Sequence, residues 1–209
     1  MSSGGVIQAL AEAAGRDVPR ETLARIECYV ALIKAAASEQ SLIAPSTINS
    51  IWERHILDSA QLVRHEPTAR ASWIDIGSGA GLPGVVVALL GEGPVTLTEP
   101  RRLRAEFLQH VIHELRLSPR VTVLQTKVER VTGTFDMITA RAVASLPRLL
   151  ELSAHLSTKK TVWALPKGRS ALAELAEAQR AWQGVFHVEQ SVTDDDSFII
   201  VASGVGKKP

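Results

Sequence analysis

The sequence is poor in cysteine, and neither sign of charge predominates. Cys28 is the only cysteine among 209 residues, which excludes an internal disulfide and a metal site built from cysteines. The chain holds 23 Lys and Arg residues against 22 Asp and Glu residues. A general electrostatic attraction to nucleic acid is therefore excluded, and any basic surface must be local.

Long apolar runs and a leader pattern are also missing. No apolar run approaches the roughly 20 residues that span a bilayer, and the start MSSGGVIQAL lacks a basic region followed by an apolar segment and a cleavage site. We therefore expect a cytoplasmic protein without a membrane association. His110 and His113 have no further ligand near them in the sequence, so no metal site is expected.

The spacing of apolar residues changes near residue 70. Residues 1–70 carry only helical patterns, with one helix predicted to begin near Pro19 and another after Pro45-Ser46-Thr47. His55 falls on the apolar face of the second of these helices. From Ser72 onward, short apolar runs alternate with longer helical patterns, which is typical of a parallel sheet covered on both faces.

The expected architecture is α/β, a mostly parallel seven-stranded sheet with a helical N-terminal extension. The closing antiparallel pair surrounds the polar turn at 193–196. We expect one domain over residues 1–209, with residues 1–70 as the extension and residues 71–209 as a Rossmann-like core. The strands are predicted at 73–76, 95–98, 121–124, 135–139, 161–165, 185–188 and 197–202, and the core helices at 84–90, 101–115, 146–156 and 170–182.

The chemistry is concentrated where the first strand turns into a helix. Gly77, Gly79 and Gly81 occupy alternate positions there; glycine allows positive φ and lets the backbone touch a ligand at the helix N-terminus. Asp75 lies two residues before the first glycine. Glu99 ends the second strand, where a carboxylate can accept both hydroxyls of a ribose. An adenosine-containing ligand is indicated.

The spacing of the glycines favours S-adenosylmethionine over a dinucleotide. The dinucleotide fingerprint GxGxxG has its third glycine one position later than Gly81. S-adenosylmethionine carries an ammonium and a sulfonium group and no phosphate, so the acidic Asp75 suits it better than a pyrophosphate. We therefore predict this methyl donor, with a nicotinamide-dependent oxidoreductase as the rival from another class.

The residues narrow the methyl acceptor without fixing it. Methylation of cytosine carbon-5 needs a cysteine nucleophile, and Cys28 lies in the N-terminal extension. The stretch Thr139–Ala144 lacks the Asn/Asp-Pro-Pro-aromatic signature of exocyclic amino-group enzymes and presents Arg141 instead. A ring nitrogen attacks with its own lone pair and needs only alignment with the methyl carbon. Arg141 is accordingly predicted to position the reactants, with no general base.

Four separated motifs lie along the chain, namely Arg54–Ser59, Asp75–Gly84, Val128-Glu129 and Arg141–Leu146. In this order they resemble a known family, the bacterial small-subunit ribosomal RNA guanine-N7 methyltransferases, also called glucose-inhibited division protein B. The resemblance implies a class I S-adenosylmethionine-dependent methyltransferase fold. It also implies methylation of N7 of one guanine in the decoding region of 16S ribosomal RNA, within the small ribosomal subunit.

The same resemblance implies roles for individual residues. Gly77 and Leu82 would line the methionine and ribose part of the donor pocket, alongside Asp75, Gly79 and Glu99 from the residue argument. Val128 and Glu129 would hold the adenine, and Arg141 would reach both the donor and the target base. The residues expected to contact RNA are Arg54, His55, Lys127 and Lys167.

The chain departs from the family pattern at two places. Ser41 and Ile43 stand where the family has Asn and Thr, and Leu103 stands where it commonly has a lysine. Two alternatives to the RNA methyltransferase are kept, a small-molecule methyltransferase and a non-catalytic RNA-binding module on the same fold. A monomer is expected.

Overall fold

The computed structural model describes residues 3–37, 40 and 42–209. Its seven strands form one sheet in the order β3-β2-β1-β4-β5-β7-β6. The strands are β1 (Trp73–Ile76), β2 (Val95–Thr98), β3 (Val121–Leu124), β4 (Met137–Ala140), β5 (Val162–Lys167), β6 (Trp182–Gln190) and β7 (Phe198–Lys207). The first five pair in parallel, and β7 is antiparallel to both β5 and β6. The predicted mostly parallel seven-stranded sheet is confirmed.

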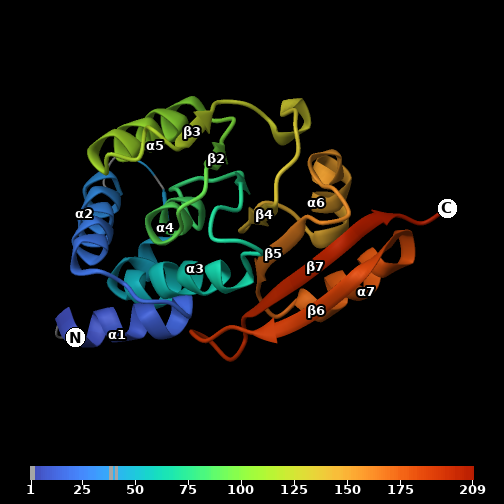
Figure 1. Ribbon diagram of the computed structural model, residues 1–209, viewed down its shortest axis with the longest axis horizontal. Coiled ribbons are helices and arrows are strands. Elements are labelled where there is room, and N and C mark those ends of the chain that lie inside the picture. The colour runs from blue at the N-terminus through green and yellow to red at the C-terminus, as the bar shows by residue number, and fades with distance from the viewer. Residues whose placement is uncertain (1–2, 38–39, 41) are drawn as a thin grey trace.

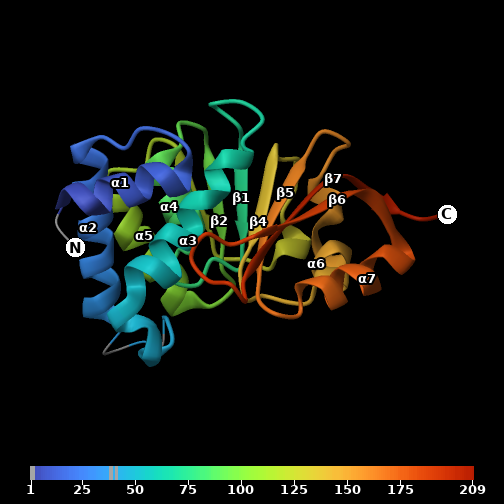
Figure 2. The same ribbon diagram turned by 90° about the horizontal axis from the view of Figure 1, so that it is seen from below.

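Helices cover both faces of the sheet (Figures 1 and 2). The α-helices are α1 (Ser3–Ala14), α2 (Arg20–Ala36), α3 (Asp58–Ala60), α4 (Gly84–Leu90), α5 (Arg102–Glu114), α6 (Leu146–Ser153) and α7 (Ala171–Ala181). The 3-10 helices are η1 (Pro45–Ser50), η3 (Gln61–His65), η4 (Val128–Arg130) and η5 (Ala154–Leu156), and η2 (Trp52–Leu57) is a π-helical turn. None of the described helices is long and apolar enough to cross a membrane.

Alternation along the strands divides the interior into two apolar layers. Trp73 of β1 packs with helices α1 to α5, and its neighbour Ile74 packs with α6 and α7 on the opposite face, because successive strand residues point to opposite sides. The layer on the first face joins Leu10 of α1 and Ile26 of α2 to Val87 of α4. The N-terminal helices therefore bury their apolar stripes directly against the layer of helices on the sheet.

The segment from Pro45 to His65 differs from the single regular helix that its apolar spacing predicts. It consists of a 3-10 helix, a wider π-helical turn, one turn of α-helix and a second 3-10 helix. The apolar pattern still sets the buried side, since Ile51, Ile56 and Leu62 are inaccessible. The wide turn η2 changes which side chains lie next to each other, and such turns frequently occur at functional sites.

The strand order reverses between β1 and β4. β2 and β3 lie on one side of β1, whereas β4 and β5 continue on the other. In open α/β sheets a ligand binds at the carboxyl ends of the strands at such a reversal, because the loops there diverge to opposite faces. The glycine loop follows β1 and Arg141 follows β4, so both lie at this position.

Candidate active site

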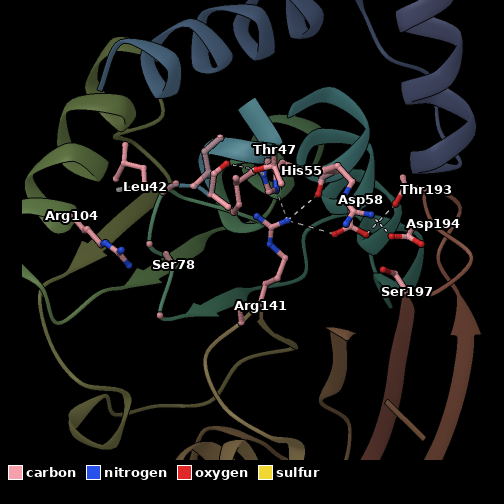
Figure 3. A pocket seen from close by; sticks show the side chains of 18 residues that line it. Leu42, Thr47, His55, Asp58, Ser78, Arg104, Arg141, Thr193, Asp194 and Ser197 are labelled. Atoms are coloured by element: carbon pink, nitrogen blue, oxygen red, sulfur yellow. Dashed lines mark hydrogen bonds and ion pairs between the residues drawn. The ribbon is translucent and has the colours of Figure 1, made fainter. Parts of the chain in front are cut away.

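A cavity of about 410 Å³ opens at the carboxyl ends of β1 and β4 (Figure 3). Its lining comes from five parts of the chain: the glycine loop, the segment from Leu42 through η1 and η2 to α3, Arg104 of α5, the end of β4, and the turn between β6 and β7. The predicted site residues in this lining are Gly77, Gly79, Leu82, Arg54, His55 and Arg141. The fold thus gathers donor-loop and predicted RNA-contacting residues around one space.

The glycine loop is shaped by backbone conformations that glycine favours. Gly77, Gly79 and Gly81 all have positive φ, at 65°, 58° and 96°. A Cβ on Gly81 would lie 2.6 Å from a Val85 methyl carbon and 2.9 Å from the Tyr29 hydroxyl, so this position has no room for a side chain. At Gly79 the nearest atoms to a Cβ lie 3.8 Å away. The loop backbone is therefore open toward the cavity at Gly79 and tightly backed at Gly81.

Two buried side chains hold the loop from behind. Tyr29 of α2 is inaccessible, and its hydroxyl donates to the carbonyl of Ala80 at 2.8 Å. Glu99 accepts from the backbone N–H groups of Gly79 at 3.0 Å and Arg101 at 2.9 Å. The N-terminal extension and the end of β2 thus fix the shape of the loop. The sequence patterns did not predict a role for Tyr29, because its contact with the loop forms only in the tertiary structure.

Asp75 lies beneath the loop rather than in the wall of the cavity. Its side chain is fully buried, and Oδ2 accepts the N–H of Gly84 at the start of α4 at 3.0 Å. Oδ1 has no hydrogen-bond partner among the described residues. Burial raises the pKa of Asp75 to about 7, against the opposing effect of the Gly84 hydrogen bond.

The elevated pKa makes Asp75 a source of pH-dependent stability. A proton is held more tightly in the folded chain than in the unfolded chain, so the free energy of unfolding should fall as pH rises from about 4 to about 7. Asp75→Asn keeps an oxygen for Gly84 and removes the titration. Between about pH 5 and about pH 8, the free energy of unfolding of the variant should rise by a few kcal/mol relative to that of the wild type. Urea unfolding at each pH measures this difference.

Asp136→Asn is a matched control for this measurement. Asp136 is an exposed carboxylate whose pKa is lowered by hydrogen bonds from the backbone and hydroxyl of Ser72. It is ionised in both the folded and the unfolded chain over that pH range, so its variant should shift the unfolding free energy by a constant amount. Parallel pH profiles for wild type and Asp75→Asn would show that Asp75 is ionised in the folded protein throughout.

Arg141 is held at the edge of the cavity by a single nitrogen. Its Nη1 lies 2.9 Å from Nδ1 of His55, 3.2 Å from the carbonyl oxygen of Arg54 and 3.6 Å from Oδ2 of Asp58. Nε and Nη2 form no hydrogen bond with another described residue. Figure 3 shows the guanidinium reaching up from β4 toward η2 and α3. The side chain is therefore anchored while part of its planar set of donors stays free for a ligand.

The contacts of Arg141 fix the protonation state of His55. An arginine only donates, so Nδ1 of His55 must accept and Nε2 must carry the proton. Nε2 lies 2.8 Å from Oγ1 of Thr47, which in turn donates to the carbonyl of Ala44 at 2.8 Å. Burial, followed by the charges of Arg141 and Arg54, lowers the pKa of His55 to about 4. His55 is thus neutral near pH 7.

Asp58 connects this site to the turn between β6 and β7. Its Oδ1 accepts from Gln61 at 3.0 Å, from Ser191 at 3.2 Å and from Thr193 at 3.4 Å. Burial raises its pKa, and the charge of Arg141 and these hydrogen bonds oppose that effect. The exposed Arg54 forms an ion pair with Asp194 in the same turn. Asp58 is in the Arg54–Ser59 motif, but its partners in the turn are invisible to sequence patterns.

The remaining predicted site residues lie outside this cavity. Lys127 and Glu129 are exposed, and Val128 is buried in the layer against α6. Lys167 lies in a neighbouring cavity. The predicted roles of all the site residues stay predictions. Leu103 is exposed, Ile43 lines the cavity, and Ser41 falls outside the described residues. Within the described part of the chain no group of three or more His, Cys, Asp and Glu residues could hold a metal ion.

Comparison with known proteins identifies the family. The model of the GidB family, described as rRNA small subunit methyltransferase G, matches residues 22–196. The chain belongs to this family. A ribosomal RNA small subunit methyltransferase G from Sphingopyxis alaskensis is 50% identical over 186 residues, covering 88% of this chain and 79% of the relative. One from Rhizorhabdus wittichii is 49% identical over 191 residues, covering 90% and 88%.

Several solved methyltransferases share this fold. An S-adenosylmethionine-dependent methyltransferase from Aquifex aeolicus superposes with a TM-score of 0.58 at 15% identity, covering 78% of this chain and 99% of the other. A ribosomal protein L11 methylase from Lactobacillus delbrueckii gives 0.58 at 16% identity, covering 75% and 80%. At these identities the likeness shows the fold alone. It confirms the Rossmann-like methyltransferase fold for this member of the rRNA small subunit methyltransferase G family.

The residues around the glycine loop fit S-adenosylmethionine, the methyl donor expected for this family. The bare backbone at Gly79 leaves room for a ligand to approach closely. Asp75 lies under the loop, and one oxygen of its carboxyl group has no hydrogen-bond partner among the described residues. The positive charge of a bound donor above the loop would favour the ionised form of this carboxyl group. Gly77, Leu82 and the adjacent Ser78 would hold the donor from the sheet side.

Proposed function

We propose that this protein transfers a methyl group from S-adenosylmethionine to N7 of one guanine in the decoding region of 16S ribosomal RNA. The observation that carries the proposal is the meeting of the glycine loop and Arg141 in one cavity at the reversal of strand order. Membership of the rRNA small subunit methyltransferase G family supports the choice of RNA as the acceptor. Guanine N7 as the attacking atom, and the position of the base in the RNA, rest on the resemblance of the four sequence motifs.

The proposed reaction is a direct displacement that needs no proton transfer. The lone pair of guanine N7 forms a bond to the methyl carbon, and the electron pair of the carbon–sulfur bond moves to sulfur. The sulfonium becomes a neutral thioether, and the methylated base gains the positive charge. S-adenosylmethionine supplies the activated methyl group when it is bound. The protein's task is then to align the two reactants and to exclude other geometries.

The anchored Arg141 is suited to such alignment. Arginine stays charged and presents a planar group of donors that matches the acceptor atoms on a guanine edge. His55, Asp58 and the carbonyl of Arg54 all contact the same nitrogen, which leaves Nε and Nη2 to face the substrate. In this arrangement His55 orients Arg141 and takes no proton.

The neutrality of His55 leads to a test of this mechanism. The pKa of His55 near 4 places its titration below the working range. Single-turnover transfer with saturating RNA and donor should therefore vary less than about twofold between about pH 6 and about pH 8. Rapid-quench measurement of labelled methyl transfer checks this. A steep rise near pH 6.5 that is abolished by His55→Ala would instead identify His55 as a base.

The substrate assignment extends to partner and location. We propose the small ribosomal subunit, or a precursor particle that contains 16S RNA, as the partner. We propose the cytoplasm as the place of action, because bacterial ribosomes are assembled there. Arg54, Arg104 and Arg141 line the cavity, and Lys127 is exposed, so basic side chains lie at this edge, where RNA phosphates would approach. A monomer is proposed.

The decisive experiment is transfer of a labelled methyl group to small-subunit particles that lack the modification. We expect one labelled guanine per particle, mapped to the decoding region and sensitive to N7-specific strand cleavage. Label in no RNA, but in small molecules of a cell extract, would favour a small-molecule methyltransferase. RNA binding without any affinity for the donor would favour a non-catalytic RNA-binding module.

A further inference from the structure

A second cavity, of about 500 Å³, adjoins the first. It lies beyond the end of β4, between the loop that leads into α6 and the end of β5. Four residues line both cavities, namely Asp58, Arg141, Ala142 and Ser197. The second cavity contains no residue of the glycine loop. The two spaces therefore meet at Arg141, one on the side of the predicted donor loop and one on the far side.

The loop at residues 142–145 forms one wall of the second cavity and is held in an unusual conformation. Ala142 has φ = 57°, a left-handed conformation that is unfavourable for a residue other than glycine. The backbone N–H groups of these four residues donate to no other described residue. Such strain concentrates at functional sites. The loop therefore places unpaired backbone donors in the segment that lines the second cavity, next to Arg141.

A partly buried ion pair holds this loop in place. Nζ of Lys167 lies 2.8 Å from Oε2 of Glu174 and 2.8 Å from the carbonyl oxygen of Ala144. The same carboxylate accepts the N–H of Leu146 at 2.7 Å and the hydroxyl of Ser170 at 2.6 Å. The side chain of Lys167 is 10% exposed and that of Glu174 18%. Lys167 is thus committed to the loop and to Glu174, which leaves it poorly placed to neutralise an RNA phosphate.

We propose that the second cavity receives the acceptor base, a purine turned out of its RNA stack, and that Lys167 and Glu174 are positioning residues for the loop that contacts it. The inference rests on the proposed function, because a methyl acceptor is what must lie next to the donor site. Purine edges offer ring-nitrogen and carbonyl acceptors that suit backbone N–H groups and arginine, and a base must leave its stack to enter such a space. The volume is within the range of small-molecule sites.

Gly168 allows the cavity to be filled without disturbing its walls. It lines the second cavity and not the first. A Cβ built on it meets no atom within 4 Å, and its φ is not positive. Gly168→Phe should therefore project a ring into the cavity. Gly206→Phe is the matched control, because Gly206 also has open space at its Cβ, lacks positive φ and lies in neither cavity.

The first measurement compares these two variants with the wild type. Gly168→Phe should lower kcat/KM for unmodified small-subunit particles at least tenfold, while its calorimetric Kd for S-adenosylmethionine stays within about twofold. Gly206→Phe should match the wild type in both. Normal transfer by Gly168→Phe would overturn the proposal, and so would an equal loss of donor affinity, which would place the ring in the donor site.

The second measurement tests the ion pair through Glu174. Glu174→Ala should lower transfer about tenfold with unchanged donor Kd, whereas Glu174→Gln, which keeps an oxygen for Leu146 and Lys167, should recover most of the rate. If Lys167 instead contacted phosphate, releasing it in Glu174→Ala would strengthen RNA binding and Lys167→Met would weaken it. That pattern would overturn the positioning role.

A third measurement separates this proposal from the function itself. Saturation-transfer NMR with guanosine monophosphate as the probe, in the presence of S-adenosylhomocysteine, reports on the base site without turnover. The wild type and Gly206→Phe should bind the probe, and Gly168→Phe should not. If no RNA is methylated but this pattern holds, the proposed function fails and the cavity assignment stands. Absence of probe binding by the wild type, or equal binding by Gly168→Phe, overturns the assignment.

Discussion

Arg141→Lys should reduce single-turnover methyl transfer about 100-fold, in the range seen when one positioned donor is lost from an active site. The variant keeps the charge and loses the planar fork. One ammonium cannot stay bound to His55, Asp58 and the Arg54 carbonyl and also direct separate donors at a base. Rapid-quench transfer to unmodified particles, with donor and RNA saturating, measures the effect.

Arg148→Lys is the control for this substitution. Arg148 is exposed on α6 and pairs with Glu151 one turn away, so the change should leave transfer within about twofold, as expected for a surface ion pair. Donor affinity of Arg141→Lys, measured by calorimetry, separates loss of alignment from loss of binding. A rate for Arg141→Lys equal to that of the wild type would mean that charge alone is sufficient and that the fork has no role.

Gly79→Val should weaken S-adenosylmethionine binding by at least about 100-fold, comparable to the loss of several close contacts. Gly79 has φ = 58° and lines the cavity, and the nearest atoms to a Cβ there, a guanidinium nitrogen of Arg104 and the carbonyl oxygen of Gly77, lie 3.8 Å away. A branched side chain would occupy the place where the donor approaches the backbone and would be strained at this φ. Isothermal calorimetry gives the affinity, and circular dichroism shows whether the fold is retained.

Gly133→Val controls for the backbone strain in that experiment. Gly133 also has positive φ, at 97°, and a Cβ on it meets nothing within 4 Å, but it lies in neither cavity. Both variants should lose stability by a similar amount, on the order of 1–3 kcal/mol, and only Gly79→Val should lose the donor. Unchanged donor affinity in Gly79→Val would exclude the glycine loop as the donor site.

The sequence predicted the sheet well because its strands are short, apolar and bounded by turns. The predicted ranges 73–76, 95–98 and 121–124 agree with β1, β2 and β3. Prediction was less accurate at the C-terminal pair, where β6 and β7 extend well past the predicted strands. Several of the added residues, such as Gln183, Glu189 and Lys207, are exposed and polar, so the hydrophobic pattern gives little signal there and backbone pairing extends the strands. Trp182 at the start of β6 is buried, and it was predicted as the last residue of the preceding helix.

The segment at residues 45–65 shows where periodicity fails. Apolar residues at three- and four-residue steps predict a regular helix, and they do predict which side is buried. The actual succession of turns depends on contacts with distant elements, such as the hydrogen bond of Gln61 to Ser191 at 2.8 Å. The spacing of apolar residues shows which face of a segment is buried. It does not show whether a turn is α-helical or contains one more residue, as a π-helical turn does.

The sequence by itself determined the fold class, the position of the glycine loop after the first strand, and the placement of Arg141 after the fourth. Each of these follows from local patterns, because strand and helix periods and glycine spacing are properties of neighbouring residues. Only the tertiary structure decided that Tyr29 supports the loop, that burial and the charges of Arg141 and Arg54 keep His55 neutral, and that a second cavity lies beyond Ala142. The contact between Arg141 and His55 joins residues 86 positions apart, and such contacts arise from the packing of whole elements, about which local pattern carries no information.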